Sequence, residues 1–236
     1  FSLHHTNFLH FPDILKKLNI KKVNGIILDL GLSSMELDQK DRGFSFQNIG
    51  PLDMRYNKKN STTASELLNK ISLIDLKKIV KLYGEEKNYS KIAKSIKQYV
   101  KNDKMKTTLD LKEAVLEVIP KKKSNKTLAR VFQSIRIAVN DELNILKETL
   151  KNIKKFLKRN GRVVIISYHS LEDRIVKQFF IKHSKVCVCP KEIPICVCKK
   201  DPPFRMISRK PILPNNTEVL RNRKSRSAKM RVVEKT

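Results

Sequence analysis

The chain has 236 residues and a formal net charge of +28, because 51 residues are Lys or Arg and only 23 are Asp or Glu. No apolar run approaches the roughly 18 residues of a membrane span, which argues against a membrane protein. The lack of a visible signal peptide favours the cytoplasm, or an organelle matrix in a eukaryote. The charge predicts contact with a polyanion, above all nucleic acid, although an AT-rich genome would also raise the number of lysines.

The N-terminal segment predicts one buried strand. Residues 1–19 have the pattern of a strand end, a loop and a short helix, an unusual start that suggests a fragment of a longer chain. Residues 24–31, "NGIILDLG", lack polar–apolar alternation. They therefore predict a strand buried on both faces of a parallel sheet, with Asp29 at its end.

A long helical region follows this strand. From Ala64 to about Pro120, three segments each carry an apolar stripe and a capping or helix-breaking residue. Residues 121–130, "KKKSNKTLAR", predict a basic link back to the first fold. The region is too long for a crossover between two strands, so we expect a small helical domain inserted into an α/β fold.

The C-terminal part alternates between helix and strand. A helix over residues 140–161 is expected to stop at Asn160-Gly161, and a buried strand covers residues 162–170. The next helix starts with Ser170 as N-cap and Asp173 at its third position. Two further strands are predicted over residues 204–214 and 227–235.

This alternation of strand and helix predicts a doubly wound α/β fold with a parallel sheet. We place the α/β domain at residues 1–47 and 149–236. The inserted all-helical domain takes residues 48–148.

Two residues at predicted strand ends are candidates for chemistry. Ligands of doubly wound folds bind at the carboxyl ends of strands, where Asp29 would accept hydrogen bonds from an amine or a hydroxyl. A turn-capping aspartate explains Asp29 equally well. His169 could accept or orient a proton, although a histidine in this position is more often a structural donor.

Arg42, Phe44 and Phe46 form an Arg-Gly-Phe-x-Phe pattern in the polar stretch after the first strand. An arginine beside two alternate aromatics could clamp a phosphate and stack an extruded base. A hydrophobic plug for a long loop is the slightly favoured alternative.

The four cysteines, Cys187, Cys189, Cys196 and Cys198, all lie in "CVCPKEIPICVC". Two Cys-x-Cys pairs could supply four thiolates to a structural zinc, although this spacing is tighter than the usual one. A reduced hairpin with inward-facing sulfurs is an equal alternative, and disulfides do not fit a reducing compartment.

Several longer blocks resemble one known family. They are "DLGLSSMELDQKDRGFSFQNIGPLDMRY", "YGEEKNYSKIAKSI", "RVFQSIRIAVNDELNIL", "GRVVIISYHSLEDRIVKQFF" and "RKSRSAKMRV". Together they look like the MraW family of S-adenosylmethionine-dependent methyltransferases, which act on the exocyclic N4 of a decoding-centre cytosine in 16S, small-subunit ribosomal RNA. The resemblance implies a Rossmann-like class I methyltransferase domain interrupted by a helical domain.

The resemblance also assigns candidate cofactor contacts. Phe8, Asp29 and Glu36 match family positions that contact S-adenosyl-L-methionine, with Glu36 where many members carry a glutamine. The family's glycine-rich loop and the acidic residue that binds the ribose have no counterpart in this sequence. We therefore expect an N-terminally truncated catalytic domain that is inactive by itself.

In the mechanism that the resemblance implies, Asp29 or the carbonyls just after it accept charge from the amine, and His169 orients the base or relays a proton. No metal is needed, so a zinc at the cysteines would be structural. The expected partner is the small ribosomal subunit; a homodimer and a non-catalytic RNA-binding module are open alternatives. The candidate RNA-binding residues are Arg42, Phe44, Phe46, Arg55, Lys121, Lys122, Lys123, Arg221, Arg223 and Arg226.

Overall fold

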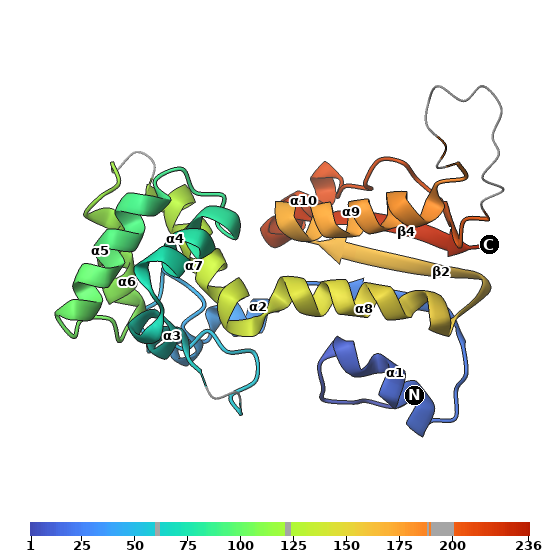
Figure 1. Ribbon diagram of the computed structural model, residues 1–236, viewed down its shortest axis with the longest axis horizontal. Helices are drawn as coiled ribbons and strands as arrows, with labels where there is room; N and C mark the ends of the chain where they lie inside the picture. Colours follow the sequence, from blue (N-terminus) through green and yellow to red (C-terminus); the bar gives the residue numbers. More distant parts are fainter. Residues whose placement is uncertain (60–61, 121–123, 188, 190–200) are drawn as a thin grey trace. The chain divides into compact units, whose positions relative to one another are not determined.

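The computed structural model describes residues 1–59, 62–120, 124–187, 189 and 201–236 (Figure 1). It divides into two compact units: Phe1–Gly31 with Leu143–Thr236, here called the sheet unit, and Leu32–Glu142, here called the helical unit. Among the described residues, no helix is long and apolar enough to cross a membrane.

The limits of the units differ from the expected domain boundaries at residues 47/48 and 148/149 because the segment after Gly31 packs on helices. Phe44 and Met54 from this segment belong to the core of the helical unit. The Asn140 side chain donates to the Met54 carbonyl (2.7 Å) and accepts from the Tyr56 N–H (2.8 Å).

The sheet unit contains a four-stranded sheet in the order β1-β2-β4-β3. β1 (Val23–Asp29) pairs parallel with β2 (Leu157–Ser167), as expected for two strands of a doubly wound fold. β4 (Lys229–Lys235) runs antiparallel to β2, because its first residue pairs with the last residue of β2. β3 (Phe204–Met206) is antiparallel to β4, so the sheet is mixed rather than purely parallel.

Two long helices, α8 (Glu142–Phe156) and α9 (Ser170–Ser184), flank β2 in the view of Figure 1. The short elements η1 (Phe8–His10) and α1 (Phe11–Lys17) precede β1. Phe11 meets Phe156 edge to face, with ring centroids 5.5 Å apart. The core of the unit includes Leu150, Ile153, Val163, Ile165, Val176 and Phe180.

Three local expectations for this unit were wrong. Residues 1–3 form no strand. α8 ends at Phe156, and the predicted helix stop, Asn160, instead lies inside β2 with a φ of 60°. Among the described residues β1 is not covered on both faces, since Ile27 is 72% exposed.

The helical unit is built from helices of 3 to 17 residues. They are α2 (Ser34–Asp38), η2 (Lys40–Arg42), α3 (Ala64–Lys70), α4 (Leu73–Leu82), α5 (Tyr89–Lys101), α6 (Thr108–Leu116) and α7 (Ser124–Asn140). Of these, α2, α3, α4 and α6 are capped by a Ser or Thr side chain. The first predicted helical segment divides in two because the Ser72 hydroxyl accepts the Asp75 N–H and starts α4. Residues 124–130, predicted as a link, are the first turns of α7, whose Leu128, Val131 and Ile135 are buried.

Candidate active site at the ends of two parallel strands

Asp29 lies at the carboxyl end of β1, next to the carboxyl end of β2. Asp29 is in register with Ile166, and the Leu30 N–H donates to the Ile166 carbonyl (3.0 Å). The Tyr168 hydroxyl donates to Asp29 Oδ1 (3.0 Å). A strand-end acid with an oriented hydroxyl partner occupies the position where open α/β sheets bind ligands.

The surroundings of the Tyr168 hydroxyl keep it protonated. Burial, followed by the hydrogen bond to Asp29, raises the pKa of Tyr168 to about 12. Tyr168 therefore remains a protonated donor at neutral pH. Asp29 is exposed and its Oδ1 is engaged by Tyr168, so its Oδ2 can accept a hydrogen bond from a ligand.

Gly31 gives the chain a turn that a larger residue would strain. Its φ is +92°, a conformation that L side chains rarely adopt, and an added Cβ would lie 3.4 Å from the Tyr168 ring. The turn lets the chain leave β1 beside Tyr168. The sequence pattern marks the Asp-Leu-Gly stop but not the hydroxyl contact, whose only signal is that Tyr168 lies near the end of a predicted strand.

His169 acts as a cap. Its Nδ1 accepts from the Glu172 N–H (3.4 Å), and the Glu172 carboxylate accepts from the backbone N–H groups of Tyr168 (3.1 Å) and His169 (3.4 Å). His169 Nε2 lies 3.2 Å from Glu172 Oε1 without hydrogen-bond alignment, and the His169 side chain is 9% exposed. The N-cap of α9 is therefore His169 rather than Ser170, with Glu172 rather than Asp173 completing the capping box. This geometry favours the structural interpretation of His169.

Asp173 instead ties α9 to β4. Its carboxylate accepts two hydrogen bonds from Arg231, at 2.6 and 3.2 Å, and Lys229 Nζ lies 3.7 Å away. Burial acts to raise the pKa of Asp173, but the Arg231 hydrogen bonds and the two positive charges hold it below the usual value. The start of α9, and with it Tyr168, is thus fixed to the sheet.

The other two candidate cofactor residues lie on separate elements. Phe8 is in η1 of the sheet unit and is 36% exposed. Glu36 is in α2 of the helical unit, where its carboxylate accepts the Ser33 N–H (3.1 Å) in a capping box. Glutamine can close the same box, so the departure from the family pattern at this position leaves the local fold intact.

The two aromatics of the Arg-Gly-Phe-x-Phe pattern pack inward. Phe44 is 6% exposed and belongs to the core of the helical unit. Phe46 packs edge to face on Phe132, with ring centroids 5.7 Å apart. This packing favours the hydrophobic plug over a base-stacking platform.

The neighbouring arginines already have protein partners. Arg42 donates to the carbonyl oxygens of Arg55 (2.7 Å) and Tyr56 (3.0 Å). Arg55 makes a two-point contact with Asp53, at 2.7 and 2.9 Å. Burial acts to raise the pKa of Asp53, and the Arg55 hydrogen bonds reverse that effect and lower it. Both arginines fasten the loop after η2.

The remaining candidates are only partly described. Arg221 in α10 (Asn216–Arg221) and Arg223 and Arg226 in η4 (Arg223–Ser227) are exposed. Lys121, Lys122 and Lys123 lie outside the described residues, as do Cys196 and Cys198. Cys187 is exposed, and its Sγ accepts the Cys189 N–H (3.4 Å), so the four-cysteine zinc hypothesis stays a prediction.

The sheet unit is an α/β fold with an acid at a strand end, and the helical unit lies between β1 and β2 in the chain. This is the architecture of a Rossmann-like class I methyltransferase. The family model described as "MraW methylase family" matches residues 1–236, and the chain belongs to this family.

Curated relatives agree with this assignment. "Ribosomal RNA small subunit methyltransferase H" of Halothermothrix orenii is 45% identical over 234 residues, covering 98% of this chain and 75% of the relative. The protein of the same name from Caldicellulosiruptor saccharolyticus is 45% identical over 232 residues, covering 98% and 76%. That from Geobacter sp. strain M21 is 43% identical over 234 residues, covering 98% and 75%.

Proposed function

We propose that the protein transfers a methyl group from S-adenosylmethionine to the exocyclic N4 of a decoding-centre cytosine in small-subunit ribosomal RNA. The observation that carries the proposal is 45% identity, over 98% of the chain, to a protein named as a ribosomal RNA small subunit methyltransferase. The net charge of +28 supports an RNA substrate.

Asp29, at the end of β1, and Phe8, in η1, fit the cofactor chemically. Asp29 is exposed and can accept a hydrogen bond from a hydroxyl or amino group. Phe8 offers a partly exposed aromatic ring in the same unit. When bound, S-adenosylmethionine supplies an electrophilic methyl group.

Asp29 also has the properties of an acceptor for the target amine. The amine of cytosine is a poor nucleophile because its lone pair is delocalised into the ring. A carboxylate that accepts an amine N–H stabilises the positive charge that builds on nitrogen during transfer. The Tyr168 hydroxyl, which donates to Oδ1 at 3.0 Å, restricts the Asp29 side chain and so reduces the cost of orienting it.

Exposed arginines of the sheet unit are the proposed RNA-binding residues. Arg221, Arg223 and Arg226 can each donate to phosphate oxygens, which positions a substrate without reading its sequence. The Phe44 ring is buried in the helical core, so it does not present a face on which a base could stack.

The test is a methyl-transfer assay with Asp29→Asn. The chain is joined to the part of the Halothermothrix orenii relative that the match does not cover, and is incubated with methyl-labelled S-adenosylmethionine and small ribosomal subunits that lack the modification. Asn keeps the size and one acceptor but removes the charge, so we expect the rate to fall by about a hundredfold or more. Asp103→Asn, at a residue whose side chain is 82% exposed in the helical unit, is the matched control and should change the rate less than about twofold.

Near-normal turnover of Asp29→Asn would place the acceptor elsewhere. RNA binding without any methyl transfer by the joined chain would favour the non-catalytic binding module. Mass spectrometry of the product RNA identifies the modified base, and a methyl group on any atom other than cytosine N4 would contradict the proposed specificity.

A further inference from the structure

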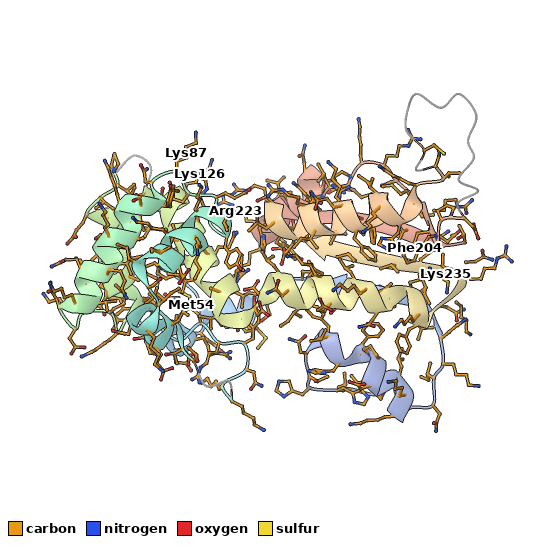
Figure 2. The ribbon with its side chains drawn as sticks, in the orientation of Figure 1. Met54, Lys87, Lys126, Phe204, Arg223 and Lys235 are labelled. Atoms are coloured by element: carbon orange, nitrogen blue, oxygen red, sulfur yellow. The ribbon has the colours of Figure 1, made fainter. Side chains whose placement is uncertain are left out.

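The turn between α4 and α5 meets the start of α7 and carries a group of cations. Its members, here called the Lys87 surface, are Lys81, Lys87, Lys91, Lys126 and Arg130. The four lysines are exposed, and the Arg130 side chain is 37% exposed. Figure 2 labels Lys87 and Lys126, which lie near each other on the helical unit in that view.

A buried acid joins the two parts of this surface. Glu86 is 4% exposed, and its Oε1 accepts the Asn88 N–H (3.1 Å). Its Oε2 accepts from the Thr127 hydroxyl (3.2 Å) and lies 3.4 Å from an Arg130 nitrogen. Because Lys87 follows Glu86 and Lys126 precedes Thr127 in the chain, this clamp holds both lysines at one place on the surface.

The charge pattern at the helix starts differs here from the rest of the unit. In α3, α4 and α6 the third residue is an acid, Glu66, Asp75 or Asp110, which is the sign that the helix dipole favours. α5 and α7 have no acid in their first turn. Their third residues are Lys91 and Lys126, at a position where the helix dipole disfavours a cation.

The Glu86 clamp brings the starts of α5 and α7 together. Both starts carry a lysine where the neighbouring helices carry an acid. Such departures from a local pattern are expected at functional sites. Glu86 is the counter-charge of Arg130 in the interior, while Glu85 is the exposed acid of the turn. Apart from the Arg130–Glu86 pair, the surface carries four exposed lysines and the exposed acid Glu85, so the local field favours an anionic partner.

Half-buried tyrosines accompany the cations. Lys81 Nζ lies 5.3 Å from the centroid of the Tyr89 ring, and the carbonyl of Tyr83 accepts from the Gln133 side chain (3.3 Å). A cation beside an aromatic ring suits RNA, which offers phosphate charge together with the flat faces of its bases.

We propose that the Lys87 surface binds the sugar–phosphate backbone of the RNA substrate, with Lys87 and Lys126 in direct contact with phosphates. This inference rests on the proposed function, because it takes ribosomal RNA as the substrate. It adds a docking site within the helical unit that is separate from the strand-end residues.

The experiment measures RNA affinity rather than methyl transfer. The full chain is titrated into a fluorescein-labelled RNA of the small-subunit decoding region, and anisotropy is followed at several salt concentrations. The test variant carries Lys87→Glu and Lys126→Glu. The control carries Lys101→Glu and Lys104→Glu, two exposed lysines at and beyond the opposite end of α5, with the same change of net charge.

We expect the test variant to weaken Kd by about tenfold or more and to reduce the slope of log K against log salt by about 0.7–0.9 per lost phosphate contact. The control should weaken Kd by less than about threefold. Lys87→Gln with Lys126→Gln should show a smaller loss in the same direction, and circular dichroism checks that each variant is folded.

Three outcomes would overturn the inference. Equal losses in test and control variants would assign the effect to net charge alone. Displacement of the RNA by polyglutamate of equal charge as efficiently as by unlabelled RNA would mark a surface for acidic polypeptides. An unchanged test variant beside a wild-type chain that binds RNA would refute the Lys87 surface only, whereas a wild-type chain without RNA affinity would also refute the RNA substrate of the proposed function.

Discussion

A single hydroxyl determines how the strand-end acid is presented. The Tyr168 hydroxyl donates to Asp29, and Gly31 turns the chain beside the tyrosine ring with a φ of +92°. Gly31→Ala would force a Cβ into this conformation and against the ring, at a cost of roughly 1–2 kcal/mol. The sequence shows the acid and the glycine, but a contact between residues 139 positions apart depends on strand pairing that no local pattern contains.

Tyr168 should be visible by its titration. Burial is the larger cause of its pKa of about 12, and the hydrogen bond to Asp29 is the next. Asp29→Asn should therefore move the pKa of Tyr168 only part of the way back toward 10.0. Because the folded-state pKa is raised, the associated stability is fully present below pH 10 and is lost as pH rises through about 12.

The measurement is the alkaline difference absorbance of the phenols. Tyr168→Phe should remove one late-titrating tyrosine, and Asp29→Asn should shift that tyrosine to lower pH. Tyr99, whose pKa is also raised to about 12 but by Glu117, serves as the control, because Tyr99→Phe should leave the Tyr168 transition in place. A Tyr168 transition that is insensitive to Asp29→Asn would contradict the hydrogen bond.

At the scale of elements, α9 is fixed to β4 by a buried ion pair that the sequence does not reveal. Helical periodicity predicted α8 without its correct end, capping residues predicted α9, and apolar runs predicted β1 and β2. The role of Asp173 depends on a residue 58 positions away in the chain, and the direction of β4 depends on its pairing with β2, so neither could be predicted locally. The same limit applies to His169. Its capping role depends on the orientation of the Glu172 side chain, which the sequence does not show.

Removing one partner of this pair should be costly. Arg231→Met leaves the 8%-exposed Asp173 without its main partner, so the free energy of unfolding at pH 7 should fall by roughly 3 kcal/mol. Because the pKa of Asp173 is lowered in the folded state, its contribution is present above the ordinary value of 3.8 and is lost as pH falls through the folded-state pKa. The deficit of the variant should therefore shrink in acid.

Urea unfolding at pH 7 and at pH 3 checks this prediction. Arg205→Met is the matched control, because the Arg205 side chain is 70% exposed in its pair with Glu234 and should contribute less than about 1 kcal/mol. Similar losses for the two variants would show that Asp173 and Arg231 do not form the buried pair in solution.

At the scale of the whole molecule, the two units differ in how the chain builds them. The sheet unit is assembled from two separate stretches, whereas the helical unit is one continuous stretch, Leu32–Glu142. Helical periodicity predicted an insertion, but its limits could not be located from sequence, because the polar segment after Gly31 gives no sign that Leu52 and Met54 fill a helical core.

The helical unit is one continuous stretch of chain with a hydrophobic core of its own. We therefore predict that residues 32–142 fold without the sheet unit. The core of the unit contains fully buried side chains from several of its helices, among them Leu68, Leu76, Ile92 and Ile96, shown as less than 2% exposed. A stretch of this size with its own core can form a cooperative domain. We expect the excised segment to have a helical circular dichroism spectrum and a single thermal transition.

Ile96→Ala is the diagnostic change, since truncating a fully buried Ile costs roughly 2–5 kcal/mol through lost contacts and a residual cavity. It should lower the melting temperature of the excised segment strongly, whereas Ile74→Ala, at a position 68% exposed, should have little effect. A segment that lacks a cooperative transition, or that responds equally to both substitutions, would mean that the helical core requires the sheet unit to form.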